Sequence, residues 1–187
     1  MGLDIRGYSK VKLVEGSDDE TIECKESWVE ELAGDSWDVY TIPYLNEDFP
    51  KHSEGLVSGV YTYYSCEDGG SRSYSGWSNF REVLAKNVGY EPITLDEVPD
   101  DWDEYTKQSF LLRPYQSRVF NVEEGTLFEL INFSDCEGVI NTTVCKKIYS
   151  DLQLVDHLEL EQRDQELLYK LLEAFKLGSD EGFVTFG

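Results

Sequence analysis

The chain has 187 residues and carries 38 acidic against 16 basic side chains, a formal net charge of −22 at pH 7. This charge excludes direct binding to nucleic acids or anionic membranes, because both require clustered Lys and Arg. Apolar residues make up 40% and aromatic residues 13% of the chain, which is enough to build a core and excludes a disordered protein. We expect a single domain over residues 1–187.

The first half of the sequence predicts mainly strands. Residues 4–14 form the opening strand, and residues 15–38 follow as an acidic, partly loop-like segment. Apolar and polar side chains alternate over residues 37–42, which indicates a second strand. Residues 56–66 hold the aromatic and β-branched side chains typical of a third. Residues 67–72, rich in glycine and acidic residues, are expected to be a loop.

The middle of the chain predicts a helix and then an acidic connector. A short helix is expected over residues 77–87, because Phe80, Val83 and Leu84 recur at i, i+3 and i+4. Residues 91–106 hold seven acidic residues and no Lys or Arg. This composition indicates an exposed connector with room for a turn of helix.

The last third has the clearest periodicity. Residues 126–133 read as a strand, residues 139–153 and 160–177 as helices, and residues 183–186 as a terminal strand. Gly178 stands where the residue after a helix C-terminus belongs. Strands early and helices late predict an α+β fold with a mixed or mainly antiparallel sheet and helices packed on one face.

A polar cluster interrupts the segment LINFSDCEGVI, residues 130–140, between an expected strand and an expected helix. Such side chains cap the free N–H groups of a helix start, and acids there meet the positive end of the helix dipole. The alternative is that the same oxygens bind a ligand. The candidate residues of this joint are Asn132, Ser134, Asp135, Cys136 and Glu137.

A second joint of the same kind covers residues 71–79. Gly/Ser loops before a helix start are natural sites for anions. Two arginines could supply charge and two aromatic rings could stack on a ligand. The alternative is that the aromatic residues pack in the core and the arginines neutralise nearby acids. The candidate residues are Arg72, Ser73, Tyr74, Ser75, Gly76, Trp77 and Arg81.

If both joints lie on one edge of the sheet, they converge where open α/β sheets commonly place ligands. Donors and cations from one joint and acceptors from the other would suit a small polar or anionic ligand, such as a nucleotide. A structural zinc site is not expected, because the four cysteines include no C-x-x-C pair and only two histidines are present. No cofactor or metal ligand is assigned.

Catalysis is the less favoured interpretation of the first joint. Cys136 is its only plausible nucleophile, but the neighbouring Asp135 and Glu137 disfavour a thiolate. The two acids could instead act as an acid/base pair or hold Mg²⁺ in a hydrolase or transferase, although D-x-E spacing is common.

The amino terminus has no basic and apolar signal segment, and no apolar run approaches the ~20 residues of a membrane span, so a cytoplasmic protein is expected. The motifs MGLDI at residues 1–5, SYSGW at residues 73–77 and LINFSDCEG at residues 130–138 resemble a family of small proteins encoded by bacteriophages and prophages. The resemblance spans most of the chain and implies a setting, the host bacterial cell, in which accessory proteins act on host defence or metabolism. No catalytic residue is carried over from it.

Three hypotheses follow. The leading one is a phage-type counter-defence protein that holds a small anionic ligand, such as a nucleotide signal, at the two joints. The second is an acidic mimic of DNA that inhibits a basic, nucleic-acid-binding host protein through the acids of residues 15–38 and 91–104. The third is an enzyme that uses Asp135 and Glu137. Whether the chain forms a homo-oligomer stays open.

Overall fold

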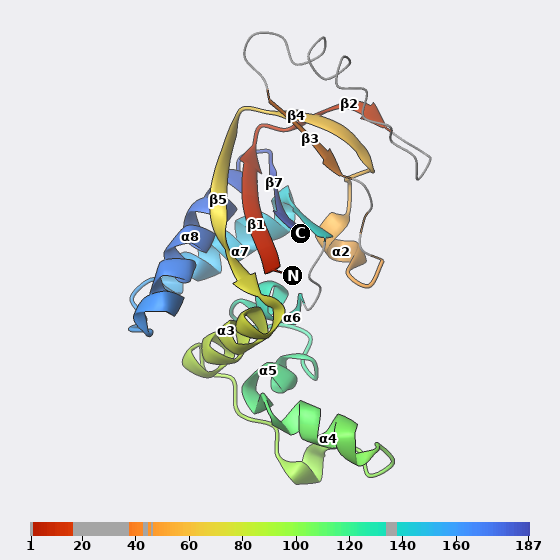
Figure 1. Ribbon diagram of the computed structural model, residues 1–187, viewed down its shortest axis with the longest axis vertical. Helices are drawn as coiled ribbons and strands as arrows, with labels where there is room; N and C mark the ends of the chain where they lie inside the picture. Colours follow the sequence, from red (N-terminus) through yellow and green to blue (C-terminus); the bar gives the residue numbers. More distant parts are fainter. Residues whose placement is uncertain (1, 17–37, 43–44, 46, 134–137) are drawn as a thin grey trace.

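A computed structural model describes residues 2–16, 38–42, 45, 47–133 and 138–187 (Figure 1). Its main sheet has four antiparallel strands in the order β5-β1-β7-β6. They are β1 (Gly2–Ser9), β5 (Ser65–Ser73), β6 (Gly138–Asn141) and β7 (Phe183–Phe186). A smaller antiparallel sheet has the order β2-β4-β3. Its strands are β2 (Lys12–Gly16), β3 (Asp38–Ile42) and β4 (Gly59–Tyr63).

Two paired chain segments run from one sheet into the other, β1 into β2 and β4 into β5. Ser9 pairs with Ser65 in the main sheet, and Lys12 pairs with Thr62 in the smaller one. The bend falls at Lys10, whose φ of 51° lies in the left-handed region. The strand predicted over residues 4–14 is therefore two strands.

The loop predicted over residues 67–72 is wrong, because these residues belong to β5. Gly69 serves close packing within the strand rather than a turn. A Cβ added at Gly69 would lie 2.7 Å from Cγ2 of Ile5, so no larger residue fits there without a shift. Gly70, with φ of 98°, lies next to the irregularity in the pairing of β1 with β5.

Helices α7 (Thr142–Val155) and α8 (Gln162–Gly178) cover one face of the main sheet (Figure 1). Leu3 and Ile5 of β1 point to this side and are fully buried. At Gly7 the helix backbone comes so close that a Cβ would lie 2.1 Å from the carbonyl oxygen of Ala174. The prediction of an α+β fold with a mainly antiparallel sheet and helices on one face is confirmed.

The opposite face carries a second, smaller core between the two sheets. The ring of Phe183 lies 5.3 Å from that of Tyr8 and 5.5 Å from that of Tyr61, between centroids. Ile42 and Val139 complete this buried cluster. Alternate residues of β7 thus serve two cores, since Val184 and Phe186 belong to the helical side.

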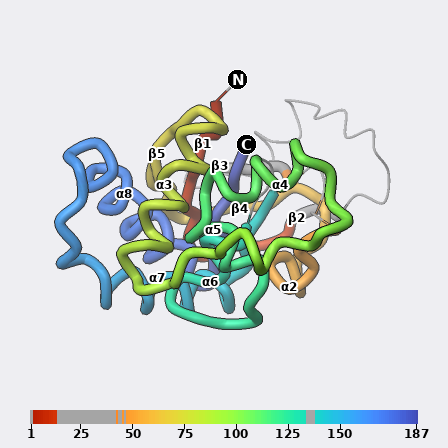
Figure 2. Tube along the Cα trace, turned by 90° about the horizontal axis from the view of Figure 1, so that it is seen from below, coloured from red at the N-terminus to blue at the C-terminus, as the bar shows by residue number. Residues whose placement is uncertain are grey.

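The remaining helices gather at the far end of the molecule (Figures 1 and 2). They are α3 (Tyr74–Asn87), the short 3₁₀ turn η2 (Leu95–Glu97), α4 (Glu104–Leu111), α5 (Pro114–Val119) and α6 (Phe128–Asn132). Helix α2 (Pro50–Ser53) lies beside β6. The turn within the acidic connector is confirmed as η2, whereas α4 and α5 were not predicted.

The strand predicted over residues 126–133 is wrong, since this segment forms α6. Leu127, Leu130 and Ile131 are all fully buried and follow the i, i+3, i+4 spacing of a helix. Leu127 turns the chain into the helix with a left-handed φ of 56°. A short apolar run of this kind does not separate strand from helix.

The two C-terminal helices were predicted with small errors at their ends. Residues 138–141 form β6, and α7 begins after Asn141, whose Oδ1 accepts the N–H of Val144 at 2.9 Å. Gly178 is the last residue of α8 rather than the one after it. The terminal strand at residues 183–186 is confirmed as β7.

Candidate functional site

The joint at residues 71–79 is a strand-to-helix connection, as predicted. β5 ends at Ser73, which caps α3, because its Oγ accepts the N–H of Gly76 at 3.2 Å. Ser73 and Ser75 are exposed, and Tyr74 is half-buried against the main core. The cap explains the run of small polar residues without a ligand.

Arg72 is directed away from this helix start. It is 7% exposed, and its Nη2 donates to the carbonyl oxygen of Arg163 at 2.5 Å and to Oδ1 of Asp164 at 3.0 Å. Both partners lie in the first turn of α8. Arg72 therefore joins the end of β5 to α8, and its charge faces a carboxylate of the same chain.

Arg81 is also part of the protein's own framework. It is 3% exposed, and its Nη1 donates to the carbonyl oxygens of Ile131 at 3.0 Å and Phe133 at 3.1 Å. The buried Gln116 amide completes the network in the orientation that satisfies both of its polar atoms. Its oxygen then accepts from Nη2 of Arg81 at 2.8 Å, and its nitrogen donates to the carbonyl oxygen of Ser78 at 3.0 Å. The arginine thus connects α3, the end of α6 and α5.

The joint at residues 130–140 differs from its prediction, because it leads from helix α6 into strand β6. The N-cap of α7 is Asn141, which lies after the polar cluster of this joint. Asn132 is the last residue of α6 and is half-buried. The predicted site residues Ser134, Asp135, Cys136 and Glu137 lie outside the described residues.

The described flanks of the two joints meet at one edge of the main sheet. The rings of Trp77 and Phe186 are 5.6 Å apart, and those of Phe133 and Phe186 are 5.0 Å apart. Gly138, which follows the second joint, pairs with Phe186 across β6 and β7. Trp77 is only 1% exposed, so its ring packs in the core and does not offer a stacking surface.

One polar group at this edge lacks a protein partner. Among the described residues, no atom accepts a hydrogen bond from the buried Nε1 of Trp77. A buried donor without an acceptor costs about 1–3 kcal/mol. This N–H points to a further hydrogen-bonding group beside Trp77.

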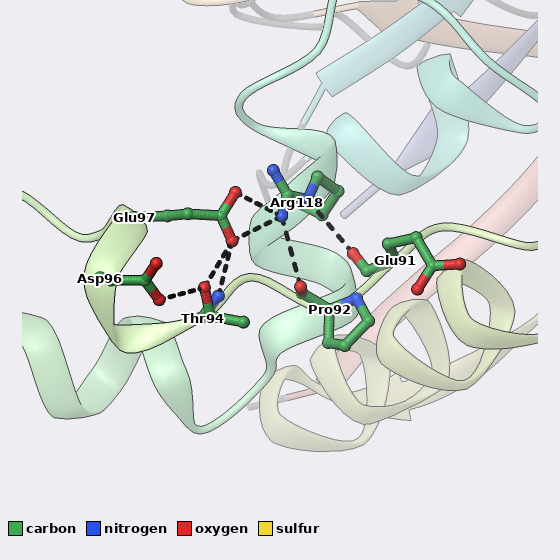
Figure 3. A network of polar contacts seen from close by, with 6 residues as sticks. All are labelled: Glu91, Pro92, Thr94, Asp96, Glu97 and Arg118. Atoms are coloured by element: carbon green, nitrogen blue, oxygen red, sulfur yellow. Dashed lines mark hydrogen bonds and ion pairs between the residues drawn. The ribbon is translucent and has the colours of Figure 1, made fainter.

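The acidic connector forms a compact structure around Arg118. The Nη2 of Arg118 lies 2.7 and 2.8 Å from the two carboxylate oxygens of Glu97 and donates to the carbonyl oxygen of Pro92 at 3.3 Å, while Nε of Arg118 donates to the carbonyl oxygen of Glu91 at 3.2 Å (Figure 3). The hydrogen bond with Arg118, followed by those with Thr94, lowers the pKa of Glu97 to about 2. Sequence reasoning missed this arginine, because it lies 21 residues from its partner.

Helix α4 follows the connector and is capped by Asp103, whose Oδ1 accepts the N–H of Thr106 at 3.0 Å. Lys107 donates to the carbonyl oxygen of Asp100 at 2.9 Å, so its bond is to backbone rather than to a carboxylate. Within the described part of the chain, Glu97 is the acid of residues 91–104 that forms an ion pair. The other six are exposed: Glu91, Asp96, Asp100, Asp101, Asp103 and Glu104.

Over the described ranges, no group of three or more His, Cys, Asp and Glu side chains could hold a metal ion. The same ranges contain no helix with the length and apolarity needed to span a bilayer. The chain matches no protein-family model, no curated protein and no solved structure.

Proposed function

We propose that the protein acts by binding a basic partner protein through its acidic surface, as an inhibitor that takes the place of nucleic acid. The observation that supports this function is the stretch of residues 91–104, where six exposed carboxylates stand without an ion-pair partner among the described residues. A nucleic-acid-binding groove presents Lys and Arg to a closely spaced row of phosphates. Exposed carboxylates in a fixed structure can meet the same cations.

The positions of the two arginines reduce the support for an anionic ligand. Arg72 and Arg81 were the cations assigned to that ligand, and both are buried in bonds to the protein's own groups. A small-ligand site at the sheet edge is retained as a second candidate because of the buried Trp77 N–H. Native mass spectrometry of protein purified from cells tests it, and protein that carries no retained small molecule would speak against it.

The acidic surface is tested by competition. A fluorescent DNA duplex is bound to poly-L-lysine, and its release by the protein is followed by anisotropy. We expect release at low salt that weakens steeply as the salt concentration rises, because exposed charge pairs are screened. No release at low salt would refute the proposed function.

A pair of matched variants locates the effect. Asp100→Asn, Asp101→Asn and Glu104→Gln together remove three exposed charges next to α4. At about 0.2–1 kcal/mol for each exposed pair, the loss corresponds to roughly tenfold weaker competition. The control removes the same charge elsewhere, with substitutions at three exposed acids between α7 and α8: Asp156→Asn, Glu159→Gln and Glu161→Gln. An equal effect of both sets would show that net charge alone acts.

A further inference from the structure

Helix α4 exposes apolar side chains where a surface helix normally exposes polar ones. Tyr105 is 80% and Leu112 is 70% exposed. They are seven residues apart, which places them on the same side of the helix about two turns from each other. Gln108 and Ser109 lie between them and are exposed too. We call this side, Tyr105 to Leu112, the outer face of α4.

Two further exposed apolar side chains lie on the segments next to α4 in the sequence. Leu95 of η2 is 67% exposed and Phe120, at the end of α5, is 41% exposed. The ring of Phe120 lies 6.5 Å from that of Phe110, which meets Trp102 edge-on at 5.2 Å. Four of the exposed large apolar side chains found in the described residues thus fall within residues 95–120. Such a concentration is typical of interaction sites.

The core does not explain why α4 is there, since none of its eight residues is buried. Helices this short are marginal in water and usually depend on burial of an apolar side. The half-buried Phe110 of α4 accepts the Ser117 hydroxyl of α5 with its carbonyl oxygen at 2.7 Å, and Asp103 caps the first turn of α4 through Thr106. These bonds fix the position of α4 while its outer face stays open to solvent.

The charge around this face defines what it fits. Asp100, Asp101, Asp103 and Glu104 directly precede Tyr105 and are exposed. A partner that covers Tyr105 and Leu112 must bring apolar side chains and, beside them, cations for these acids. A cationic amphipathic helix has both on adjoining sides. A second copy of this chain, with its net charge of −22, brings the wrong sign.

We propose that the outer face of α4 is a docking surface for a cationic amphipathic helix of a partner protein. This inference rests on the proposed function and names the kind of partner. Carboxylates speed the encounter with a cationic helix, whereas burial of Tyr105 and Leu112 holds it.

The experiment uses the full chain and two fluorescent probes of equal charge. One is a synthetic amphipathic helix of leucine and lysine, and the other is poly-L-lysine. We expect the protein to bind the amphipathic helix at least about tenfold more tightly, which corresponds to about 1.4 kcal/mol. Tyr105→Ser with Leu112→Ser should remove this preference without unfolding the protein, because both side chains are largely exposed.

The matched control is Leu154→Ser with Tyr169→Ser, which removes two side chains of the same types, 66% and 53% exposed, from α7 and α8. It should leave the preference unchanged. Equal binding of the two probes, or equal effects of the two double variants, overturns the docking surface while the basic-partner function stands. Failure of both probes to bind overturns that function as well. A free protein that sediments as a dimer and becomes monomeric in the Tyr105 and Leu112 variant would assign the face to a second copy instead.

Discussion

Replacing Arg81 by Met tests whether this arginine holds the fold or serves a ligand. Met keeps most of the apolar side chain but removes the donors of the two hydrogen bonds to Ile131 and Phe133. Each buried carbonyl left without a donor costs about 1–3 kcal/mol. Two of them, partly relieved by local movement, lower the free energy of unfolding by about 3 kcal/mol.

Urea denaturation measures this loss. Trp77 is buried one turn before Arg81, so its fluorescence reports unfolding of this region. With a urea dependence of about 1–3 kcal/mol per molar for a protein of this kind, the midpoint should fall by roughly 1–3 M. The control is Arg163→Met, because the Arg163 side chain is exposed and only its carbonyl oxygen is used by Arg72. This control should move the midpoint little.

If the urea midpoint of Arg81→Met equals that of the Arg163→Met control, the reasoning is refuted. The two hydrogen bonds to Ile131 and Phe133 would then contribute little to the free energy of unfolding. Hydrogen exchange adds a local readout. Amides of α6 should exchange faster in Arg81→Met, because the arginine holds the carbonyl end of that helix.

Three further predictions concern pH, packing and thiol chemistry. Burial lowers the pKa of His52 from its ordinary value of about 6.5. The unfolded chain therefore binds a proton at higher pH than the folded protein does, so the free energy of unfolding should fall as pH drops below about 6.5. This dependence on pH should be weaker in His52→Gln, and an equal dependence in both proteins would contradict the prediction. Gly7→Ala should destabilise the protein by at least about 1–3 kcal/mol in urea, because the methyl group meets the backbone at Ala174; Gly2→Ala, whose nearest contact is 3.5 Å away, should not. In the folded protein iodoacetamide should modify the exposed Cys66 and spare Cys145, because Cys145 is buried and burial raises its pKa. Peptide mass spectrometry measures the labelling, and modification of Cys145 before Cys66 would contradict the prediction.

Local periodicity predicted the elements that bury one regular face. Helix α8 is the clearest example, since Leu167, Leu168 and Leu171 are buried at helical spacing. The same reasoning failed at α6, where a run of apolar residues fits a strand and a helix equally. It also failed at Gly69, because a glycine needed for close packing looks like a glycine needed for a turn.

The arginines of the candidate site illustrate a second limit. Arg72 and Arg81 stand beside a polar helix start in the sequence, which made an anion site plausible. Their hydrogen-bond partners lie 91 and 50 residues further along the chain. No local pattern reveals such partners, because the tertiary fold brings them together. The meeting of the two joints was a hypothesis that the order of elements did not settle, and in the structure the described flanks of both joints contact Phe186.

The burial of these two arginines bears directly on how the protein can bind. Arg81 donates to backbone carbonyl oxygens and Arg72 is paired with Asp164, so both cations are already bound by groups of the protein itself. An acidic surface attracts many basic proteins with similar strength, so it does not by itself select one of them. Selection requires contacts that only one partner can bury, and in the proposed docking the exposed Tyr105 and Leu112 would provide them. Charge and apolar area at α4 thus have separate roles, and the paired variants at Asp100 and at Tyr105 measure them independently.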